Sequence, residues 1–209
     1  MRALVTGGGG FIGSNLVDLL LKHDLDVTVL DDFSSGHKDN LSHLNEVYVI
    51  EGDVRDASTV EAAAAGAELI FHMAASVGNQ RSLDDPMRDA EINVLGTLQV
   101  LQAAAKNSVR KIVLSSSAGI FGEIRQVPIA EGHPTDPVSP YGASKLGAEK
   151  AVLAHGSVHG IEVVCLRYFN VYGVRQRYDA YGNVIPIFAN HMIHNEPLTV
   201  FGDGQQTRD

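Results

Sequence analysis

Close to its start the chain reads Ala3-Leu4-Val5-Thr6-Gly7-Gly8-Gly9-Gly10-Phe11-Ile12-Gly13. The apolar run at 3–6 predicts a short buried strand, and the apolar spacing of 11–23 predicts a helix directly after it. Gly7, Gly10 and Gly13 have the spacing G-x-x-G-x-x-G. Glycines at this spacing allow a tight turn, a close approach to a pyrophosphate, and packing of the helix on the strand. The stretch therefore predicts a strand–turn–helix unit whose helix N-terminus binds phosphate.

The rest of the chain alternates short apolar runs with longer helical patterns, which is typical of a parallel sheet covered by helices. Further strands are predicted at 27–30, 47–50, 68–71, 111–114, 161–166 and 198–201. Helices are predicted at 57–65, from Asp84 or Asp85 to about Asn107, from Ser139-Pro140 to Gly156 or Gly160, and at 184–195. We expect an α/β fold, a doubly wound parallel sheet of the Rossmann type, over residues 1–167. Residues 168–209 are expected to begin a smaller substrate-binding region.

Composition narrows the possible functions. Hydrophobic residues make up 44% of the 209 residues and charged residues 20%, which is enough apolar material for a folded core. The net charge of −9 argues against a nucleic-acid partner, and the apolar runs are too short for a membrane helix of about 18 residues. Cys165 is the only cysteine, so no internal disulfide is possible, and the first strand leaves no room for a signal peptide. We therefore expect a cytoplasmic location.

Acidic residues follow two of the predicted strands. Asp31 and Asp32 stand about 20 residues beyond the glycines, where an acid typically bonds the adenosine ribose of a dinucleotide. An acid at this position disfavours a 2′-phosphate, which favours NAD over NADP. Asp53, with Val54 beside it, is a candidate for contact with adenine. The alternative for Asp31 and Asp32 is a solvated strand end.

Tyr141 and Lys145 are four residues apart on a predicted helix, so both side chains project from one face. Three serines, Ser115 to Ser117, follow an earlier strand. A tyrosine with its ordinary pKa near 10 is a poor base, but a nearby ammonium and a positive nicotinamide ring would lower that pKa. Tyr141 would then take a proton from a substrate hydroxyl that Ser117 orients. The alternative is an ordinary pair on a helix surface.

Several motifs are shared, in the same order, with one protein family. They are the glycine-rich turn, His72-Met73-Ala74-Ala75, Asn93-Val94-Leu95-Gly96-Thr97, the three serines, Tyr141-Gly142-Ala143-Ser144-Lys145, Arg167-Tyr168-Phe169-Asn170-Val171-Tyr172-Gly173, and Phe201-Gly202-Asp203-Gly204-Gln205-Gln206-Thr207-Arg208-Asp209. With them the chain resembles the extended short-chain dehydrogenases/reductases of the nucleotide-sugar epimerase/dehydratase group, most of all the UDP-glucose 4-epimerase-like enzymes. One departure is Ile120-Phe121-Gly122, where many relatives have Val-Tyr-Gly.

The resemblance implies the roles of individual residues. Ser117, Tyr141 and Lys145 would be catalytic. NAD would be bound by Gly7, Gly10, Phe11, Ile12, Gly13, Asp31, Asp32, Phe33, Ser34, Ser35, Gly36, Asp53, Val54, Met73, Ala74, Ala75, Asn93, Ser115, Tyr141, Lys145, Tyr168 and Phe169. The substrate would be bound by Ser117, Tyr141, Asn170, Asn183, Val184, Thr199, Phe201 and Arg208. No metal site is expected.

Three activities stay open. The first is epimerisation at C4 of a UDP-hexose through a transient 4-keto intermediate, with Tyr141 as the base. The second is a nucleotide-sugar dehydratase or decarboxylase, but dehydratases that resemble this chain carry Asp-Glu where this one has Ala118 and Gly119. The third is a non-catalytic NAD-binding protein. The resemblance also implies a homodimer, formed through the helices at 85–107 and 140–156.

Overall fold

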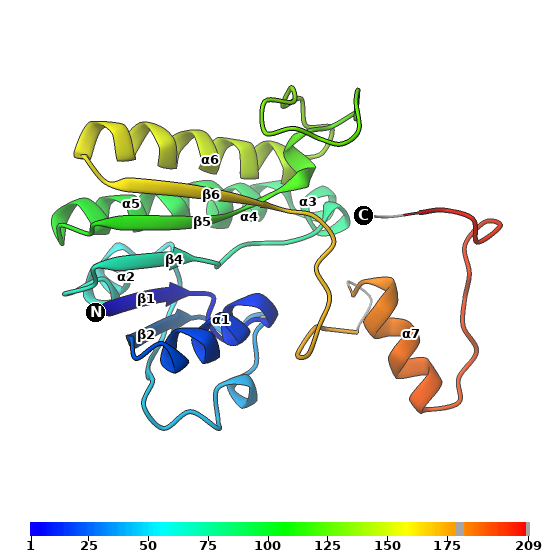
Figure 1. Cartoon of the computed structure of the whole chain (residues 1–209), viewed down its shortest axis with the longest axis horizontal. Helices are drawn as coiled ribbons and strands as arrows, with labels where there is room; N and C mark the ends of the chain where they lie inside the picture. Colours follow the sequence, from blue (N-terminus) through cyan, green and yellow to red (C-terminus); the bar gives the residue numbers. More distant parts are fainter. Residues whose placement is uncertain (179–181, 208–209) are drawn as a thin grey trace.

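Six parallel strands form the centre of the fold (Figure 1). The computed structural model describes residues 1–178 and 182–207. The strands are β1 (Arg2–Thr6), β2 (Asp26–Asp31), β3 (Tyr48–Glu51), β4 (Leu69–His72), β5 (Lys111–Ser117) and β6 (Glu162–Tyr168). Their order across the sheet is β3-β2-β1-β4-β5-β6. The order reverses between β1 and β4, and ligands of open parallel sheets bind at this point, beyond the carboxyl ends of the strands.

The predicted doubly wound α/β fold is confirmed, as are the predicted strands up to residue 166. The register places Thr6 of β1 between Leu30 of β2 and His72 of β4. Strand β5 is longer than predicted and includes the three serines. The strand predicted at 198–201 is wrong, because that segment has extended chain without a strand and Phe201 is 80% exposed. A strand needs a hydrogen-bonded neighbour, and no strand in the described part of the chain pairs with it.

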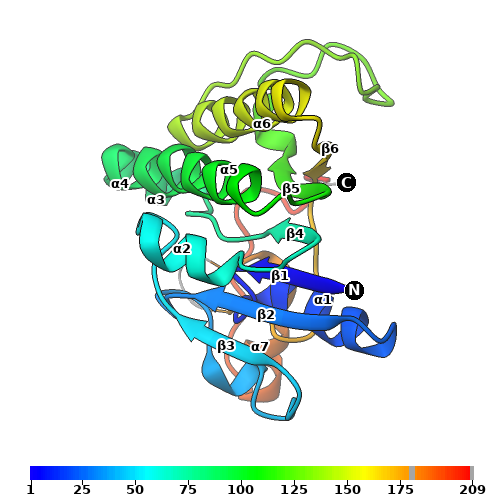
Figure 2. The same cartoon turned by 90° about the vertical axis from the view of Figure 1, so that its left-hand side faces the viewer.

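Helices cover the two faces of the sheet unequally. On one face lie α2 (Ala57–Ala63), α5 (Thr97–Lys106) and α6 (Pro140–His159), and on the other α1 (Phe11–Lys22) (Figure 2). Leu4 of β1 packs into the core formed with α2 and α5, whereas Ala3 and Val5 pack into the core formed with α1. Both faces of β1 are therefore buried, which is why the strand is apolar throughout.

Two predicted helix starts are confirmed by their capping bonds. The Asp85 carboxylate accepts a hydrogen bond from the Arg88 amide at 3.0 Å, at the start of α4 (Pro86–Ala90). The Ser139 hydroxyl accepts one from the Gly142 amide at 3.1 Å, at the start of α6. Each satisfies an amide that the first helical turn leaves without a backbone partner.

The helix predicted between 85 and 107 is interrupted. It consists of α4, the π-helical segment η2 (Glu91–Gly96) and α5. A short helix before it, α3 (Asn79–Asp84), was not predicted, since it has only six residues and no capping side chain. The remaining short helices are η1 (Lys38–Asn40) and η3 (Ala118–Ile120).

After β6 the chain leaves the sheet. Helix α7 (Val184–Ile193) lies beyond the carboxyl edge of the strands in Figure 1, and none of its residues is buried. It ends two residues before the predicted boundary. Among the described residues, we find no helix that combines the length and the apolar character needed to cross a bilayer.

Candidate active site

The glycine-rich turn has the geometry that its sequence predicts. Gly7 has a φ of +70°, and its amide bonds Leu30 O at 2.8 Å. A Cβ at Gly7 would lie 2.6 Å from the Ala74 amide nitrogen, and one at Gly13 would lie 2.1 Å from Gly7 O. No side chain caps the start of α1, so its first amides face outward from Gly10. The turn therefore offers donors and a partial positive charge to a phosphate.

Asp31 holds this turn in place. Its carboxylate accepts the Gly9 amide and the Phe33 amide, both at 2.8 Å. Burial raises the pKa of Asp31, and the hydrogen bonds from the two amides, which lower it, only partly offset this effect. Asp32 accepts the backbone and hydroxyl of Ser34 at 3.0 and 2.7 Å. The sequence predicted a ribose contact for Asp31, and the structure adds a second role, the fixing of the turn.

The loop after β2 also closes over the glycines. The His37 amide and the Asn40 side chain both bond Gly9 O, at 3.0 and 2.8 Å. Gly36 lies so close that a Cβ there would be 2.7 Å from the Gly9 carbonyl carbon. Asn40 was missed by the sequence analysis, because nothing in its local pattern distinguishes it from any other loop asparagine.

At the third strand, Asp53 is bound by a neighbour on the same loop. Arg55 donates from Nε to both carboxylate oxygens at 3.0 Å and from Nη2 at 2.6 Å, and it also bonds Glu91 at 2.8 Å. The hydrogen bonds from Arg55 hold the pKa of Asp53 below its ordinary value. Val54 is buried in the core formed with α2 and α5. The predicted contacts of Asp53 and Val54 with adenine stay predictions.

Ser117 and Tyr141 come together at the carboxyl end of β5. The Ser117 hydroxyl accepts the Gly119 amide at 3.1 Å and lies near the Tyr141 side chain. A Cβ at Gly119 would lie 3.4 Å from Ser117 Oγ and 3.6 Å from the Tyr141 ring. Lys145 follows one turn later on α6 and is only 3% exposed. The structure thus places the three predicted catalytic residues on adjoining elements at one edge of the sheet.

The pKa values of Tyr141 and Lys145 reflect the burial of both side chains. Burial raises the pKa of Tyr141, the contact with Ser117 lowers it by less, and the charge of Asp89 raises it further. Burial also lowers the pKa of Lys145 to about 8, although the negative charge of Asp89 opposes that change. In the protein alone, burial and the charge of Asp89 therefore raise the Tyr141 pKa; the predicted lowering by Lys145 together with a positive nicotinamide ring stays a prediction.

A buried polar network supports the tyrosine and lysine. Ser144 Oγ donates to the Asp89 carboxylate at 2.5 Å, and Asn93 donates to Asp89 at 3.2 Å and to Ser144 Oγ at 3.0 Å. Asn93 also bonds both backbone groups of Ser76, at 2.9 and 3.0 Å. Asn93 is 1% exposed. Its observed contacts are structural, and its predicted contact with NAD stays a prediction.

His72, missed as a site residue by the sequence analysis, links three strands and a helix. Its Nδ1 lies 2.7 Å from Thr6 Oγ1 and its Nε2 lies 3.0 Å from Thr97 Oγ1. Thr97 donates its own proton to Asn93 O at 2.6 Å, so it accepts from His72 Nε2–H, and Thr6 donates to Nδ1. Burial lowers the pKa of His72 to about 3, and the charge of Lys145 adds to the effect.

The three serines point in different directions because side chains alternate along a strand. Ser115 Oγ donates to His72 O at 3.0 Å, and Ser116 Oγ donates to Glu149 at 2.6 Å. Glu149 is 1% exposed and pairs with Arg167 at 2.7 Å. This pair joins α6 to β6. The sequence motif identified the three serines, but only the fold shows that Ser116 donates to a carboxylate of a buried ion pair.

The other predicted residues are divided between the carboxyl edge of the sheet and the C-terminal segment. Met73, Ala74 and Ala75 follow β4 beside the glycine turn. Burial raises the pKa of Tyr168 at the end of β6, and Phe169 packs against Phe121 at 6.2 Å.

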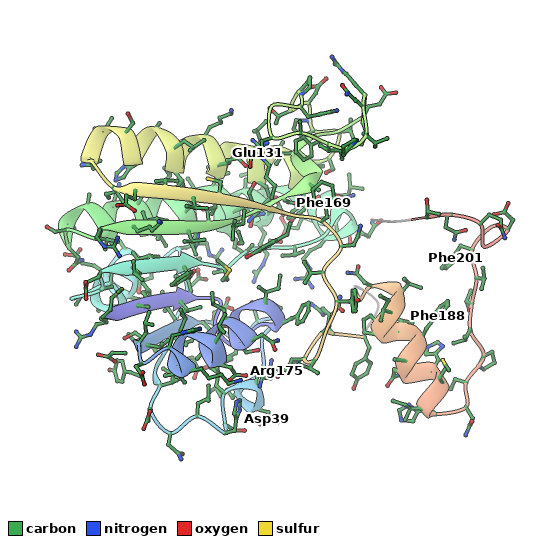
Figure 3. The ribbon with its side chains drawn as sticks, in the orientation of Figure 1. Asp39, Glu131, Phe169, Arg175, Phe188 and Phe201 are labelled. Atoms are coloured by element: carbon green, nitrogen blue, oxygen red, sulfur yellow. The ribbon has the colours of Figure 1, made fainter. Side chains whose placement is uncertain are left out.

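The predicted substrate residues beyond Asn170 are not gathered at this edge. Asn183 lies beside the start of α7 and Val184 begins it, and both Thr199 and Phe201 are exposed. Figure 3 shows Phe201 well apart from Phe169. Arg208 lies outside the described residues.

These residues fit an NAD cofactor. The glycine-rich turn can pack this tightly only because Gly7 and Gly13 have no Cβ, and the packed turn leaves the first amides of α1 for a pyrophosphate. The Lys145 side chain is only 3% exposed and lies one helical turn after Tyr141 on α6. A buried donor of this kind fits a polar ligand such as a ribose hydroxyl.

Comparisons with known proteins agree with this geometry. The sequence pattern of the NAD dependent epimerase/dehydratase family matches residues 3–209. A putative UDP-glucose 4-epimerase of Methanocaldococcus jannaschii is 41% identical over 208 residues, which are 99% of this chain and 68% of that protein. The crystal structure of a Thermotoga maritima UDP-glucose 4-epimerase with UDP-glucose has a TM-score of 0.95 at 36% identity, covering 100% of this chain and 68% of the other.

A dehydratase is similar as well. The Streptomyces venezuelae dTDP-glucose 4,6-dehydratase DesIV, solved with NAD bound, has a TM-score of 0.91 at 33% identity, covering 100% of this chain and 67% of the other. The chain thus spans about two thirds of the length of these relatives. It belongs to the NAD-dependent epimerase/dehydratase family, as an extended short-chain dehydrogenase/reductase that uses NAD.

Proposed function

We propose that this chain carries the NAD-binding and catalytic residues of a UDP-hexose 4-epimerase that acts through a 4-keto intermediate. The observation that carries the proposal is the proximity of Ser117 to Tyr141, with the buried Lys145 one helical turn after Tyr141. Ala118 and Gly119 follow Ser117 directly in the sequence. These last two residues bring no acid or base for chemistry at neighbouring carbons. The set therefore suits proton transfer at one hydroxyl and nothing further.

In this proposal the chain's residues act on the C4 hydroxyl. Tyr141 Oη takes its proton, Ser117 Oγ bonds the same oxygen, and the Lys145 ammonium stabilises the phenolate by its charge. When bound, NAD+ supplies the hydride acceptor and later the donor. Because burial and the charge of Asp89 both raise the Tyr141 pKa, we expect the positive charge that lowers it to include that of the oxidised nicotinamide. Tyr141 would therefore be a base mainly in the NAD+ form of the enzyme.

The cofactor would lie along the carboxyl edge of the sheet. The amides of Gly10, Phe11 and Ile12 would bind the pyrophosphate, the loop at 31–36 the adenosine ribose, and Asp53 with Val54 the adenine. Residues 73–75, 168 and 169 would surround the nicotinamide. The buried Asp31 carboxylate favours NAD over NADP, since it would repel a 2′-phosphate.

The nucleotide part of the sugar substrate is proposed to contact the segment after β6. Asn170, Asn183, Val184, Thr199, Phe201 and Arg208 match the positions that hold it in the family. A guanidinium such as that of Arg208 can pair with a diphosphate through two parallel hydrogen bonds. The Thermotoga maritima relative, solved with UDP-glucose, supports the choice of UDP.

A dehydratase is the second candidate, and the DesIV likeness keeps it in view. One observation against it concerns Asp89, the carboxylate whose charge acts on both Tyr141 and Lys145. That residue is 1% exposed, and its oxygens bond Ser144 and Asn93. It is therefore a poor acid for protonating a substrate carbon. A non-catalytic NAD-binding protein is the third candidate, but it would have no need for a buried lysine beside a tyrosine.

The test is to incubate the intact protein with UDP-glucose and UDP-galactose and to follow both C4 epimers by NMR. We expect interconversion without net consumption of NAD, and a loss of about 10³-fold in kcat for Tyr141→Phe, since general-base catalysis is worth about that much. Tyr48→Phe is the matched control, because Tyr48 is 68% exposed on β3, away from the site. A 4-keto-6-deoxy product would instead indicate a dehydratase, and NAD binding without turnover a non-catalytic role.

We also propose a cytoplasmic homodimer that buries the outer surfaces of η2, α5 and α6. Leu95, Leu98 and Leu153 expose 53%, 39% and 44% of their surfaces there, and helices α5 and α6 lie side by side (Figure 1). In sedimentation velocity, the protein should run as a dimer and Leu98→Glu with Leu153→Glu as a monomer. Val127→Glu, 74% exposed in a loop, should leave the assembly unchanged. A wild-type monomer at micromolar concentration would contradict the dimer.

A further inference from the structure

The segment 171–176, called the strap here, lies along the surface of α1. Its Gly173 backbone lies against the Phe11 ring, since a Cβ there would be 3.5 Å from it. Val174 O accepts the Asn15 side chain at 3.2 Å. The contacting residues of α1 are 11, 15 and 18, which lie on one face of a helix. The strap thus contacts each successive turn of α1.

The third contact is an ion pair. Arg175 Nη2 lies 2.7 Å from the Asp18 carboxylate, and each of the two side chains is only 22% exposed. Surface pairs elsewhere are more open; in Lys106–Glu61 the two side chains are 61% and 49% exposed. Arg175 itself has a φ of +69°, a conformation that costs energy for a residue other than glycine. The pair therefore holds a strained backbone in place.

Asp18 has a second partner in the loop after β2. His43 Nε2 lies 2.9 Å from its other oxygen, and the same loop bonds the Gly9 carbonyl through His37 and Asn40. Arg175 Nη2 also lies 3.4 Å from His43 Nε2 of this loop, which places its side chain beside the loop (Figure 3). Burial opposes ionisation of Asp18, but the hydrogen bonds from Arg175 and His43 outweigh it and hold its pKa below the ordinary value. Asp18 is thus the point where three chain segments meet.

The three segments serve different parts of the proposed site. Helix α1 begins at the glycine-rich turn, the loop after β2 covers that turn, and the strap leads from Tyr168 and Asn170 to α7. On the proposed function, the first two hold NAD and the third holds the nucleotide of the sugar. We infer that Asp18 and Arg175 are positioning residues that couple the cofactor side of the site to its nucleotide-sugar side.

The coupling follows from shared contacts. A ligand that fixes the start of α1 also fixes Asn15 and Asp18, and through them the backbone of the strap. When NAD binding orders the strap, the second ligand binds more tightly to the ordered strap. The second ligand tightens NAD binding by the same factor, because such coupling is reciprocal. Without the ion pair, the strap keeps only two of the contacts with α1 described above, the Phe11 contact and the single hydrogen bond from Asn15, so we expect it to lose most of its order on α1 and the two ligands to bind almost independently.

The experiment measures UDP affinity by calorimetry, with and without saturating NAD+, on the intact protein. For the wild type we expect NAD+ to tighten UDP binding about five-fold, the lower end of typical couplings. In Asp18→Asn and Arg175→Gln that factor should fall to about one, while the NAD+ affinity changes less than two-fold. Asp18→Glu, which keeps the carboxylate, should restore most of it. Glu61→Gln, which breaks the exposed pair with Lys106, is the matched control.

Hydrogen exchange gives a measurement that needs no ligand. In both variants, amides at 171–176 should exchange faster than in the wild type before any cofactor is added, while the strands exchange unchanged. Equal exchange in the variants, or an unchanged coupling factor, would overturn the inference and leave the proposed function intact. Failure of the wild type to bind NAD+ would overturn the proposed function and the coupling with it.

Discussion

Acidification from pH 6.5 to pH 3 is expected to remove about 4 kcal/mol of unfolding free energy through His72 alone. Burial lowers the pKa of this imidazole from its ordinary 6.5 to about 3. The unfolded chain takes up a proton near pH 6.5, whereas the folded chain resists it until about pH 3. The stabilisation is therefore complete above pH 6.5 and is lost as the pH falls through this window.

The hydrogen bonds of His72 explain why the folded state resists the proton. Thr6 donates to Nδ1, and Nε2–H donates to Thr97, whose own proton goes to Asn93 O. A proton on Nδ1 would place two donors against each other in a site that water does not reach. The ammonium of Lys145 is close enough to oppose a second positive charge.

The measurement is urea unfolding of the wild type and His72→Gln at several pH values between 7.5 and 3.5. We expect the variant to be less stable at pH 7.5 but to lose much less stability on acidification. His23→Gln, at an exposed position, should follow the wild type. If His72→Gln does not fold, Thr97→Val tests the same network, with an expected cost of about 1–3 kcal/mol for the unpaired donor. Parallel slopes for wild type and His72→Gln would contradict the prediction.

Replacing Lys145 by methionine is expected to stabilise the protein by up to about 3 kcal/mol at pH 7. Burial lowers the pKa of this ammonium from 10.5 to about 8. Below pH 8 both folded and unfolded chains carry the charge, so the folded chain bears the whole desolvation cost. Between pH 8 and pH 10.5 the folded chain has lost the proton and the unfolded chain has not, so the wild type gains stability as the pH rises.

The check is urea unfolding of Lys145→Met and wild type at pH 7 and pH 10.5. The variant should be clearly more stable at the lower pH, and the difference should shrink at the higher one. Lys150→Met, an exposed position on the same helix, should differ little from the wild type at either pH. A Lys145→Met variant less stable than the wild type at pH 7 would refute the argument. Loss of the proposed epimerase activity together with gained stability would show that the lysine is retained for function at the expense of stability.

Local sequence rules predicted most of the fold. The glycine spacing, the apolar strands and the caps at Asp85 and Ser139 depend on neighbours close in the chain, and the structure has each of them where the sequence indicated. The strand at 198–201 failed because its partner, which local pattern cannot supply, is absent from the described residues. The interruption of the helix at η2 was missed for a related reason, since Asn93 there bonds residues far away in sequence.

The pKa of Tyr141 marks the limit of prediction from spacing. The sequence places a lysine one helical turn away and so suggests a lowered value, but it does not reveal how deeply both residues are buried. In the structure, burial raises the Tyr141 pKa, and Asp89 adds its negative charge from another helix. The balance between solvation and charge depends on three-dimensional distances, which residue spacing along a helix does not give.

By itself, the sequence determined the parallel sheet, the phosphate-binding turn and the residue types for proton transfer, because each follows from short-range backbone sterics and side-chain chemistry. The tertiary structure alone decided the neutral state of His72, the charge environment of Lys145 and the pairing of Asp18 with Arg175. Those properties arise where elements distant in sequence exclude water together. Burial is a collective result of packing, and no single stretch of the chain encodes it.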